Sequence, residues 1–351
     1  MTSATVRREI RWGMIGAGNV TESKSGPAFN KVAGSSMVAV MRRTAHLAKD
    51  YALRHGIPNW FADADELLAC KEVNAVYIAT PPNMHAEYAI RAMKAGKPVY
   101  VEKPMALNYE ACRRMLKASH ETGQPLFVAY YRRALPAFLK VKELIDTGQI
   151  GNPLLVEVVL HREARENDLH PDKNSWHVNP QIAGGGYFFD LASHQMDYLD
   201  FLFGPVTEAK GIAVNQAGYY AAEDTVTGTF SFENRVSGTG SWCFVAPKQS
   251  ANDIIKITGT KGLITIPTFT HGEVMMHNHE GVHKFRFQNP ENIQFNLIRQ
   301  VVAELQGLAN CLSTGESAAR TSAVLEEMVK GYYRNQNSEP VRTKGSCRVN
   351  L

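Results

Sequence analysis

The sequence predicts an α/β protein in two parts: a doubly wound parallel sheet, followed by an α+β part with a large, mostly antiparallel open sheet. Three observations lead to this prediction. The chain has 351 residues, more than one hydrophobic core usually supports, which suggests about two domains. Over the first 125 or so residues, short apolar runs alternate with amphipathic stretches. Beyond residue 150, strand-like segments follow one another with little helix between them.

Strands of the first part are predicted where successive positions are apolar, as in a parallel sheet covered on both faces. These runs are 12–15, 37–41, 75–79, 99–101 and 126–129. Helices are predicted between them, over 44–55, 63–69, 84–95 and 109–122. Gly56, Gly96 and Gly123 stand where glycines commonly end helices. The segments therefore follow the order of right-handed βαβ units.

The second part begins with a predicted helix over 135–147. Strands that alternate apolar and polar residues, typical of an antiparallel sheet with one exposed face, are predicted over 154–160, 209–214, 225–232, 236–244, 254–258 and 263–266. Two helices, over 293–312 and 317–333, close the chain. We expect two domains, residues 1–130 and residues 131–351.

Composition argues against several classes of protein. Thirty-eight Lys and Arg residues stand against 34 Asp and Glu, a net charge of +4, without the basic stripe of a nucleic-acid-binding protein. The polar N-terminus has no apolar stretch long enough for a signal peptide, and no run of about 18 apolar residues occurs, so no membrane span is predicted. The five cysteines are scattered and form no CxxC motif, which fits a reducing compartment. We expect a soluble, cytoplasmic protein that binds neither nucleic acid nor membrane.

Several histidines gather near residue 280 and raise the question of a metal site: His271, His277, His279 and His283. The segment is predicted to form a hairpin that turns near Glu280 and Gly281. No acidic or thiol ligand set surrounds the histidines in the sequence. A solvated hairpin explains them better, and no metal is predicted.

A glycine-containing loop follows the first predicted strand and reads Gly16-Ala17-Gly18-Asn19-Val20-Thr21. Two glycines at this spacing allow a tight turn and bring backbone amides against a pyrophosphate at a helix N-terminus. Thr21 occupies the third position of the G-x-G-x-x-G/A pattern, a departure that permits slightly less intimate packing. Glycine turns after strands are often mere punctuation, but this position in a β/α series favours dinucleotide binding. The predicted contacts are Gly16, Gly18, Asn19 and Val20.

The end of the second strand bears on which dinucleotide binds. A carboxylate there would accept hydrogen bonds from the ribose 2′-hydroxyl of NAD, but the sequence has Arg42 and Arg43 instead. Two guanidiniums offer bidentate contacts to a 2′-phosphate. Arginines at strand ends are also often solvated surface charges. We predict NADP, with NAD as the alternative.

Two more segments follow strands at the carboxyl edge, where cofactors bind in such sheets. The predicted cofactor contacts in them are Thr80, Pro81, Asn83, His85, Glu102 and Lys103. Lys103 can point at the nicotinamide end of a cleft, and Pro104 can fix an unusual turn through a cis bond. Taken alone, Glu-Lys-Pro is equally an ordinary turn tripeptide.

A third segment begins with the glycine run 184–186 and continues through Asp190, His194 and Asp197. The i, i+4, i+7 spacing would place all three side chains on one face of a helix. A histidine beside a carboxylate is suited to proton transfer. The alternative is an amphipathic helix with a polar outer face, because its other side carries an apolar stripe: Leu191, Met196, Leu199 and Phe203.

With these motifs in this order, the chain resembles the glucose–fructose oxidoreductase, inositol dehydrogenase and rhizopine-catabolism superfamily of NAD(P)-dependent sugar oxidoreductases. The resemblance covers nearly the whole chain. It implies a dinucleotide-binding Rossmann domain and an α+β substrate-binding domain whose open sheet forms oligomer contacts, in a homodimer or homotetramer. It also implies that Lys103, Asp190 and His194 match the catalytic lysine, aspartate and histidine.

One position departs from the family pattern. Many relatives carry Phe-Asn-Arg-Arg after the strand at 126–129, whereas this chain has Tyr130-Tyr131-Arg132-Arg133. Tyr131 therefore stands where an asparagine is common. This bears on the choice of sugar more than on the reaction class, and we expect Tyr131 to line the substrate site.

Other substrate contacts are expected in the polar segments 161–170 and 174–177. A sugar or polyol needs directional hydrogen-bonding groups and an aromatic platform, which Trp176 and His177 can provide. A polar surface loop with one buried indole explains these residues equally well.

The leading function is hydride transfer between a nicotinamide cofactor and a sugar, sugar derivative or polyol. Lys103 would stabilise the substrate oxygen, and His194 would move the proton while Asp190 orients the imidazole or contacts a hydroxyl. An alternative is an NAD-dependent glycosidase or lyase that oxidises its sugar transiently. A non-catalytic dinucleotide-sensing regulator is disfavoured because Lys103 and His194 are both present.

Overall fold

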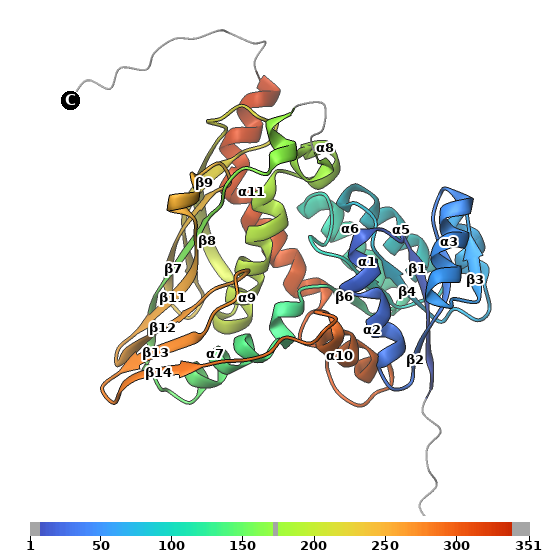
Figure 1. The fold of residues 1–351 in the computed structure, drawn as a ribbon, viewed down its shortest axis with the longest axis horizontal. Helices are drawn as coiled ribbons and strands as arrows, with labels where there is room; N and C mark the ends of the chain where they lie inside the picture. Colours follow the sequence, from blue (N-terminus) through green and yellow to red (C-terminus); the bar gives the residue numbers. More distant parts are fainter. Residues whose placement is uncertain (1–7, 171–174, 339–351) are drawn as a thin grey trace, which may run out of the picture.

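The computed structural model describes residues 8–170 and 175–338. Two sheets organise the chain, one of six strands and one of eight. Figure 1 shows them side by side, each with its own helices. This arrangement confirms the predicted fold class: a parallel Rossmann sheet at the N-terminus and a mixed, mostly antiparallel sheet after it.

The first sheet has the strand order β3-β2-β1-β4-β5-β6, and every neighbouring pair is parallel. Its strands are β1 (Ile10–Ile15), β2 (Ser35–Met41), β3 (Asn59–Phe61), β4 (Ala75–Ile78), β5 (Val99–Val101) and β6 (Leu126–Val128). The chain order reverses between β1 and β4, which creates the switch point where ligands bind in open α/β sheets. Of these strands, only β3 was not predicted.

The helices between these strands include the four that the sequence predicts: α3 (Ala45–His55), α4 (Ala64–Ala69), α5 (Pro82–Lys94) and α6 (Tyr109–Thr122). Gly56 and Gly123 end α3 and α6 in the left-handed conformation, as expected. Two short helices, α1 (Asn19–Ser23) and α2 (Gly26–Lys31), were not predicted. They carry the chain from the glycine loop to β2.

The second sheet has the order β14-β13-β12-β11-β7-β10-β9-β8. Its strands are β7 (Pro153–His161), β8 (Val206–Val214), β9 (Thr225–Phe232), β10 (Ser237–Cys243), β11 (Asn252–Gly259), β12 (Gly262–Ile266), β13 (Val274–Asn278) and β14 (Gly281–Phe285). Only the β7–β10 pair is parallel. The β13–β14 hairpin turns where the sequence predicts, between Asn278 and Gly281.

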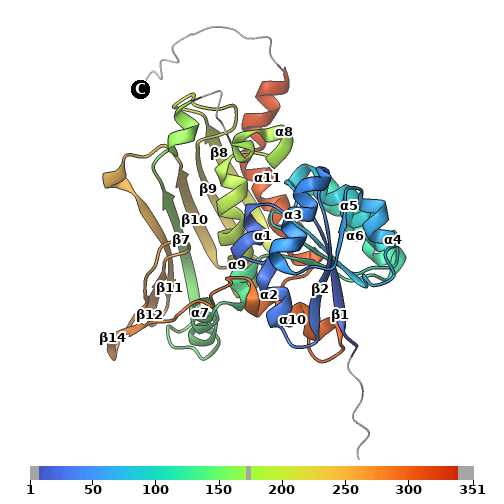
Figure 2. The same cartoon turned by 45° about the vertical axis from the view of Figure 1, so that its right-hand side comes forward.

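Helices pack on one face of this second sheet: α7 (Pro136–Asp146), α9 (Ser193–Phe203) and α11 (Gly315–Ser338). Figures 1 and 2 show no α-helix of the described residues on the opposite face. Inward side chains of the strands, such as Val158, Trp242 and Ile257, form one buried cluster with apolar residues of these helices. The structure therefore positions α9 between the eight-stranded sheet and the six-stranded one.

Late segments of the chain return to the first sheet. Helix α10 (Phe295–Leu305) buries Leu297 and Val301 in the same cluster as Trp12 and Phe29. It is shorter than the helix predicted over 293–312. None of the helices in the described ranges is both long and apolar enough to cross a membrane.

Candidate active site

The glycine loop forms a tight turn at the carboxyl end of β1. Gly16 has a φ of +94°, and a Cβ there would lie 2.8 Å from the Cγ2 atom of Thr80, so only glycine fits. A Cβ on Gly18 would meet nothing within 4 Å, and Gly18 is the N-cap of α1 without a side-chain cap. The space next to the Cα of Gly18 is therefore open, and no side chain caps α1. Thr21 is fully buried, and its hydroxyl donates back to the Gly18 carbonyl over 2.8 Å.

The Thr80 segment lies directly against this loop, at the end of β4. The Thr80 hydroxyl is buried and has no hydrogen-bond partner, although buried polar atoms are normally satisfied. Pro81 caps α5, and Asn83 is exposed on the first turn of that helix. The predicted contacts Gly16, Gly18, Thr80 and Asn83 are thus gathered at one edge of the sheet.

Arg42 and Arg43 follow β2 on the other side of the same loop, where the Gly16 amide donates to the Met41 carbonyl. Arg42 is half-buried and Arg43 is exposed. Neither guanidinium forms an ion pair with any carboxylate in the described ranges. Two cations without an ion-pair partner among the described residues therefore lie beside the glycine loop.

Glu102 and His85 lie behind this edge and join its loops together. The Glu102 carboxylate accepts hydrogen bonds from the Tyr77 hydroxyl at 2.7 Å and from Gln294 Nε2 at 2.6 Å. The ring nitrogens of His85 lie 2.7 Å from the Thr80 carbonyl and 3.0 Å from the Pro104 carbonyl. Both side chains are buried. Their contacts hold the Thr80 and Lys103 segments in place, and burial lowers the pKa of His85.

Lys103 reaches across from the first sheet to the second part of the chain. Its Nζ donates to Asp190 Oδ1 at 2.5 Å and to the Asp190 carbonyl at 3.0 Å. Both side chains are mostly buried, 16% and 17% exposed. Burial opposes ionisation of Asp190, but the Lys103 charge and the field of His177 and Arg165 lower the pKa of Asp190 to about 2. The Lys103–Pro104 peptide bond is cis, as the sequence predicts.

Asp190 lies in a π-helical turn, Phe188–Ala192, that leads into α9. Such turns often occur at functional sites. The preceding Gly184 has a φ of +88°, and a Cβ there would lie 2.2 Å from the Leu107 carbonyl oxygen. The glycine run therefore lets this turn approach the segment that follows Lys103.

The prediction that one helical face presents Asp190, His194 and Asp197 together is wrong. The wider π turn separates Asp190 from the regular helix, and its carboxylate pairs with Lys103 instead of orienting the imidazole. Asp197 is buried and pairs with Arg133, with Oδ2 2.7 Å from Arg133 Nε.

His194 lies at the start of α9 inside an aromatic enclosure, and only 3% of it is exposed. The rings of Tyr130, Tyr131 and Phe269 meet its imidazole edge-on at centroid distances of 5.8, 5.1 and 6.0 Å. Its Nδ1 atom has no hydrogen-bond partner. Burial, followed by the field of nearby cations, lowers the pKa of His194 well below its usual value. The imidazole is therefore neutral at neutral pH.

Trp176 and His177 stack on each other at 3.7 Å between ring centroids. Trp176 is exposed, and His177 is half-buried. Burial lowers the pKa of His177, while the negative field of Asp190 opposes that shift. The structure thus brings His177 within electrostatic range of the Lys103–Asp190 pair.

Two neighbours of His194 were missed by sequence reasoning as site residues. The Arg132 guanidinium lies 4.3 Å above the Phe269 ring and 5.1 Å from the Tyr131 ring. Phe269 lies in a loop that Asp253 holds in place, because the Asp253 carboxylate accepts a hydrogen bond from the Phe269 amide. No local motif marks Phe269, because its role depends on a loop 75 positions beyond His194.

The described residues contain no group of three or more histidine, cysteine or acidic side chains that could hold a metal. His277 lies in β13 and His283 in β14, and His279 is exposed in the turn between them.

Comparisons with known proteins agree with this architecture. Residues 10–130 match the oxidoreductase family with an NAD-binding Rossmann fold. Residues 138–265 match the GFO/IDH/MocA C-terminal domain. Curated relatives of the chain are named as reductases and dehydrogenases of sugars and polyols.

Among these relatives, Oxidoreductase P35 from Formosa agariphila is 37% identical over 90% of this chain and 97% of its own length. A 1,5-anhydro-D-fructose reductase from Ensifer adhaerens is 28% identical over 94% of this chain and 98% of its own. A crystal structure of a putative NADPH-dependent oxidoreductase from Desulfitobacterium hafniense superposes with a TM-score of 0.83. It covers 93% of this chain and 96% of its own, at 23% identity, so it shows the fold.

Proposed function

The chain belongs to the GFO/IDH/MocA family of NAD(P)-dependent oxidoreductases, and from that premise we propose that it transfers a hydride between NADP(H) and a sugar, sugar derivative or polyol. Lys103, Asp190 and His194 form the proposed catalytic group. Lys103 pairs with Asp190, and the Lys103 charge is among those that lower the pKa of His194; these interactions support the proposal.

The glycine loop and its neighbours fit a dinucleotide. The space next to Gly18 is open and no side chain caps α1, and the buried Thr80 hydroxyl lacks a partner that a ligand could supply. Gly16, Gly18, Asn19, Val20, Thr80, Pro81 and Asn83 would hold the cofactor, with Glu102 and His85 supporting them. The bound nicotinamide would supply the hydride acceptor or donor. Arg42 and Arg43 favour NADP because they are unpaired cations suited to a 2′-phosphate.

Lys103 would act on the reacting oxygen of the substrate. Its ammonium is held by Asp190 in a mostly buried position, where a fixed positive charge interacts strongly with charge that develops during reaction. Asp190 serves chiefly to orient this ammonium, in place of the imidazole-orienting role expected from the sequence.

His194 would exchange the proton of the substrate hydroxyl. Because its pKa is well below the usual value, the neutral imidazole is ready to accept a proton at neutral pH, as the oxidation of an alcohol requires. Reduction of a carbonyl would first require protonation of the ring, which burial and the nearby cations oppose. His194 would therefore act as the base in the direction of alcohol oxidation.

The substrate would lie among Tyr131, Trp176, His177, Asp190 and His194. Tyr131 contributes an aromatic wall beside His194, and Trp176 offers the exposed platform that sugar rings commonly contact. His177 lies within electrostatic range of Lys103 and Asp190. We infer a small polyhydroxylated substrate from this mixture of aromatic and polar groups.

The observation that carries the proposal is the Lys103–Asp190 pair. It joins residues 87 positions apart, at the boundary between the two sheets and beside a histidine with no partner on Nδ1. A merely structural surface ion pair would not require this burial or this neighbourhood.

A spectrophotometric screen at a wavelength where reduced nicotinamide absorbs tests the proposal. Keto-sugars, anhydrosugars, inositols and glycosides are each offered with NADP(H) and with NAD(H). We expect stoichiometric cofactor turnover with at least one polyol or sugar. Consumption of a glycoside without net cofactor turnover would instead indicate transient oxidation by a glycosidase or lyase, and dinucleotide binding without any turnover would indicate a sensor.

We further propose a homodimer or homotetramer that forms through the open face of the eight-stranded sheet. Exposed apolar side chains on its strands include Leu155, Ile212 and Val282. Alternation along the strands places them opposite the buried face that packs on α9. Light scattering after size-exclusion chromatography tests this: Ile212→Glu should shift the particle toward the monomer mass, and a monomeric wild type would reject the proposal.

A further inference from the structure

A buried ionic cluster lies one helical turn beyond His194. Arg133 is 4% exposed, and its Nε and Nη2 atoms donate to the two carboxylate oxygens of Asp197 at 2.7 and 2.8 Å. Nη2 also donates to the Asp197 carbonyl at 3.0 Å and to Asp200 Oδ1 at 3.2 Å. Nη1 donates to the Leu312 carbonyl at 3.0 Å. Each nitrogen of the guanidinium is therefore engaged.

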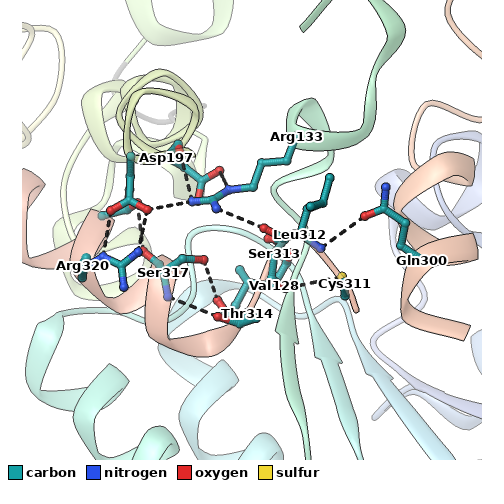
Figure 3. Close-up of polar contacts among 12 residues, drawn as sticks. Val128, Arg133, Asp197, Gln300, Cys311, Leu312, Ser313, Thr314, Ser317 and Arg320 are labelled. Atoms are coloured by element: carbon teal, nitrogen blue, oxygen red, sulfur yellow. Dashed lines mark hydrogen bonds and ion pairs between the residues drawn. The ribbon is translucent and has the colours of Figure 1, made fainter. Parts of the chain in front are cut away.

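The cluster connects parts of the chain that are far apart in sequence. Figure 3 shows Arg133 pointing at Asp197 on α9, with Arg320 of α11 and the segment around Leu312 on other sides. Arg320 donates to both oxygens of Asp200 at 2.8 Å. Ser313, next to Leu312, donates to the Val128 carbonyl of β6 at 2.7 Å. The guanidinium of Arg133 thus ties α9 to the last strand of the first sheet.

The placement of Arg133 links it to the surroundings of His194. Arg133 belongs to the 3-10 turn η1 (Tyr131–Ala134), whose Tyr131 ring contacts the imidazole. Asp197 follows His194 by three positions on α9, so the two side chains are neighbours on the helix surface. One bidentate pair therefore fixes the distance between the aromatic wall on η1 and the helix that carries His194.

A second set of contacts holds the other side of α9. Gln195 accepts a hydrogen bond from the Trp242 indole at 2.8 Å and donates to the Thr268 hydroxyl at 3.0 Å. These contacts fix α9 against the eight-stranded sheet. Between α9 and η1, the polar contacts of the described residues are those of Arg133 with Asp197 and Asp200.

We propose that Arg133 is a positioning residue for the reaction: through its bidentate contact with Asp197, it holds His194 at a fixed distance from the aromatic wall and from Lys103. This proposal rests on the proposed function of His194. Arg133 itself touches no reacting atom, and it acts through α9. A small displacement of a catalytic group can lower the rate about 100-fold, so the loss of this contact is measurable as turnover.

A purely structural role is the competing explanation, and Arg320 provides the matched control. It belongs to the same cluster and contacts α9 through Asp200, but one turn further from His194. Its side chain is 43% exposed. Because Asp200 also pairs with Arg133, the removal of Arg320 leaves Asp200 with a cationic partner. The structural role predicts that both arginines change stability and neither changes turnover far below the melting temperature.

The experiment compares Arg133→Lys, Asp197→Asn and Arg320→Gln with the wild type. Turnover is measured with the sugar or polyol found in the screen, well below each melting temperature. We expect Arg133→Lys and Asp197→Asn to lower kcat about 10- to 100-fold, with cofactor Kd unchanged, and the double variant to be no worse than either single one. Arg320→Gln should keep kcat within about twofold of the wild type.

A readout independent of catalysis follows the same variants. Diethylpyrocarbonate carbethoxylates accessible neutral imidazoles, and peptide mass mapping reports the rate at His194. We expect slow modification in the wild type and in Arg320→Gln, and faster modification in Arg133→Lys and Asp197→Asn. Unchanged kcat in both pair variants would overturn the proposal whatever the modification rate, as would equal kcat losses in Arg320→Gln.

The two proposals fail in different ways. If the wild type turns over no sugar or polyol, the proposed function fails, and the modification rates alone decide the positioning role. If Arg133→Lys does not fold, Asp197→Asn, which keeps the shape of the side chain, decides it. If turnover is normal in both folded variants, the function stands and Arg133 is structural.

Discussion

Two arginine pairs follow strands of the same parallel sheet, but their surroundings in the structure differ. Arg42 and Arg43 follow β2 beside the glycine loop. Arg43 is exposed, and neither arginine has a carboxylate partner among the described residues. Arg132 and Arg133 follow β6 and are both buried, one above aromatic rings and the other in an ionic cluster. Arg42 and Arg43 therefore remain open to a ligand, whereas other residues of the protein already engage Arg132 and Arg133.

This contrast shows how one dipeptide acquires two roles. At the end of β2, the chain turns directly into α3 and leaves the guanidiniums at the surface. At the end of β6, the chain passes beneath α9, where two aspartates are buried. Buried carboxylates need cations, so Arg133 is engaged by Asp197 and Asp200 and is not open to a ligand.

Replacement of Arg133 by methionine should have the largest effect on stability. It would leave Asp197 buried without its bidentate partner, which costs about 3–5 kcal/mol in known buried pairs. Arg43→Met, at an exposed position, should stay within about 0.5 kcal/mol of the wild type. Denaturant unfolding monitored by circular dichroism measures both free energies. Similar losses for the two variants would contradict the contrast.

The double substitution Arg42→Ala and Arg43→Ala should have the next largest effect, and on cofactor affinity. Losing charge-assisted bonds to a 2′-phosphate, worth about 1.5–3 kcal/mol each, should weaken NADPH binding at least about tenfold. NADH lacks that phosphate, so its Kd should not change. Fluorescence titration of both cofactors provides the values, and equal weakening of both would reject NADP as the preferred cofactor.

Arg132→Met should have the smallest effect, on the pH dependence of alcohol oxidation. His194 must be neutral to accept a proton, so the rate falls as pH falls through the pKa of His194. Arg132 lowers that pKa, second only to burial, and its removal should move the acid limb of kcat to higher pH. Because burial remains, the limb should stay below about pH 6.5.

Arg43→Met is the control for this pH profile. Arg43 is not among the charges that shift the pKa of His194, so its acid limb should coincide with that of the wild type. An identical limb in Arg132→Met would show that Arg132 does not influence the base.

Sequence patterns predicted most of the first sheet because its signals are local. Short segments carry these signals, such as the continuous apolar run 99–101 and the helix 109–122, which ends before a glycine. The strand β3 was missed because it has three residues and its Trp60 is 42% exposed. Helix α10 ends at Leu305 rather than near 312, since the following segment turns back to bond with β6.

The candidate site was predictable only in part. Local motifs pointed to Gly16, Gly18 and Arg42 and raised Lys103, Asp190 and His194 as candidates, and the family resemblance matched these last three to its catalytic residues. Two further contacts join distant segments, which sequence periodicity cannot predict. Phe269 packs against His194, and Arg133 pairs with Asp197. The π-helical turn also has no sequence signal, and it is the reason that Asp190 meets Lys103 instead of the imidazole.

The most direct test of the central claim is the turnover of Lys103→Met, measured by nicotinamide absorbance alongside NADPH affinity. The side chain of methionine is similar in length but carries no charge. The account predicts that kcat falls by about 100-fold or more, the order lost when a preorganised stabilising group is removed, while the Kd for NADPH stays within about twofold. Near-normal turnover, or a loss that follows NADPH affinity alone, would contradict a catalytic role for Lys103.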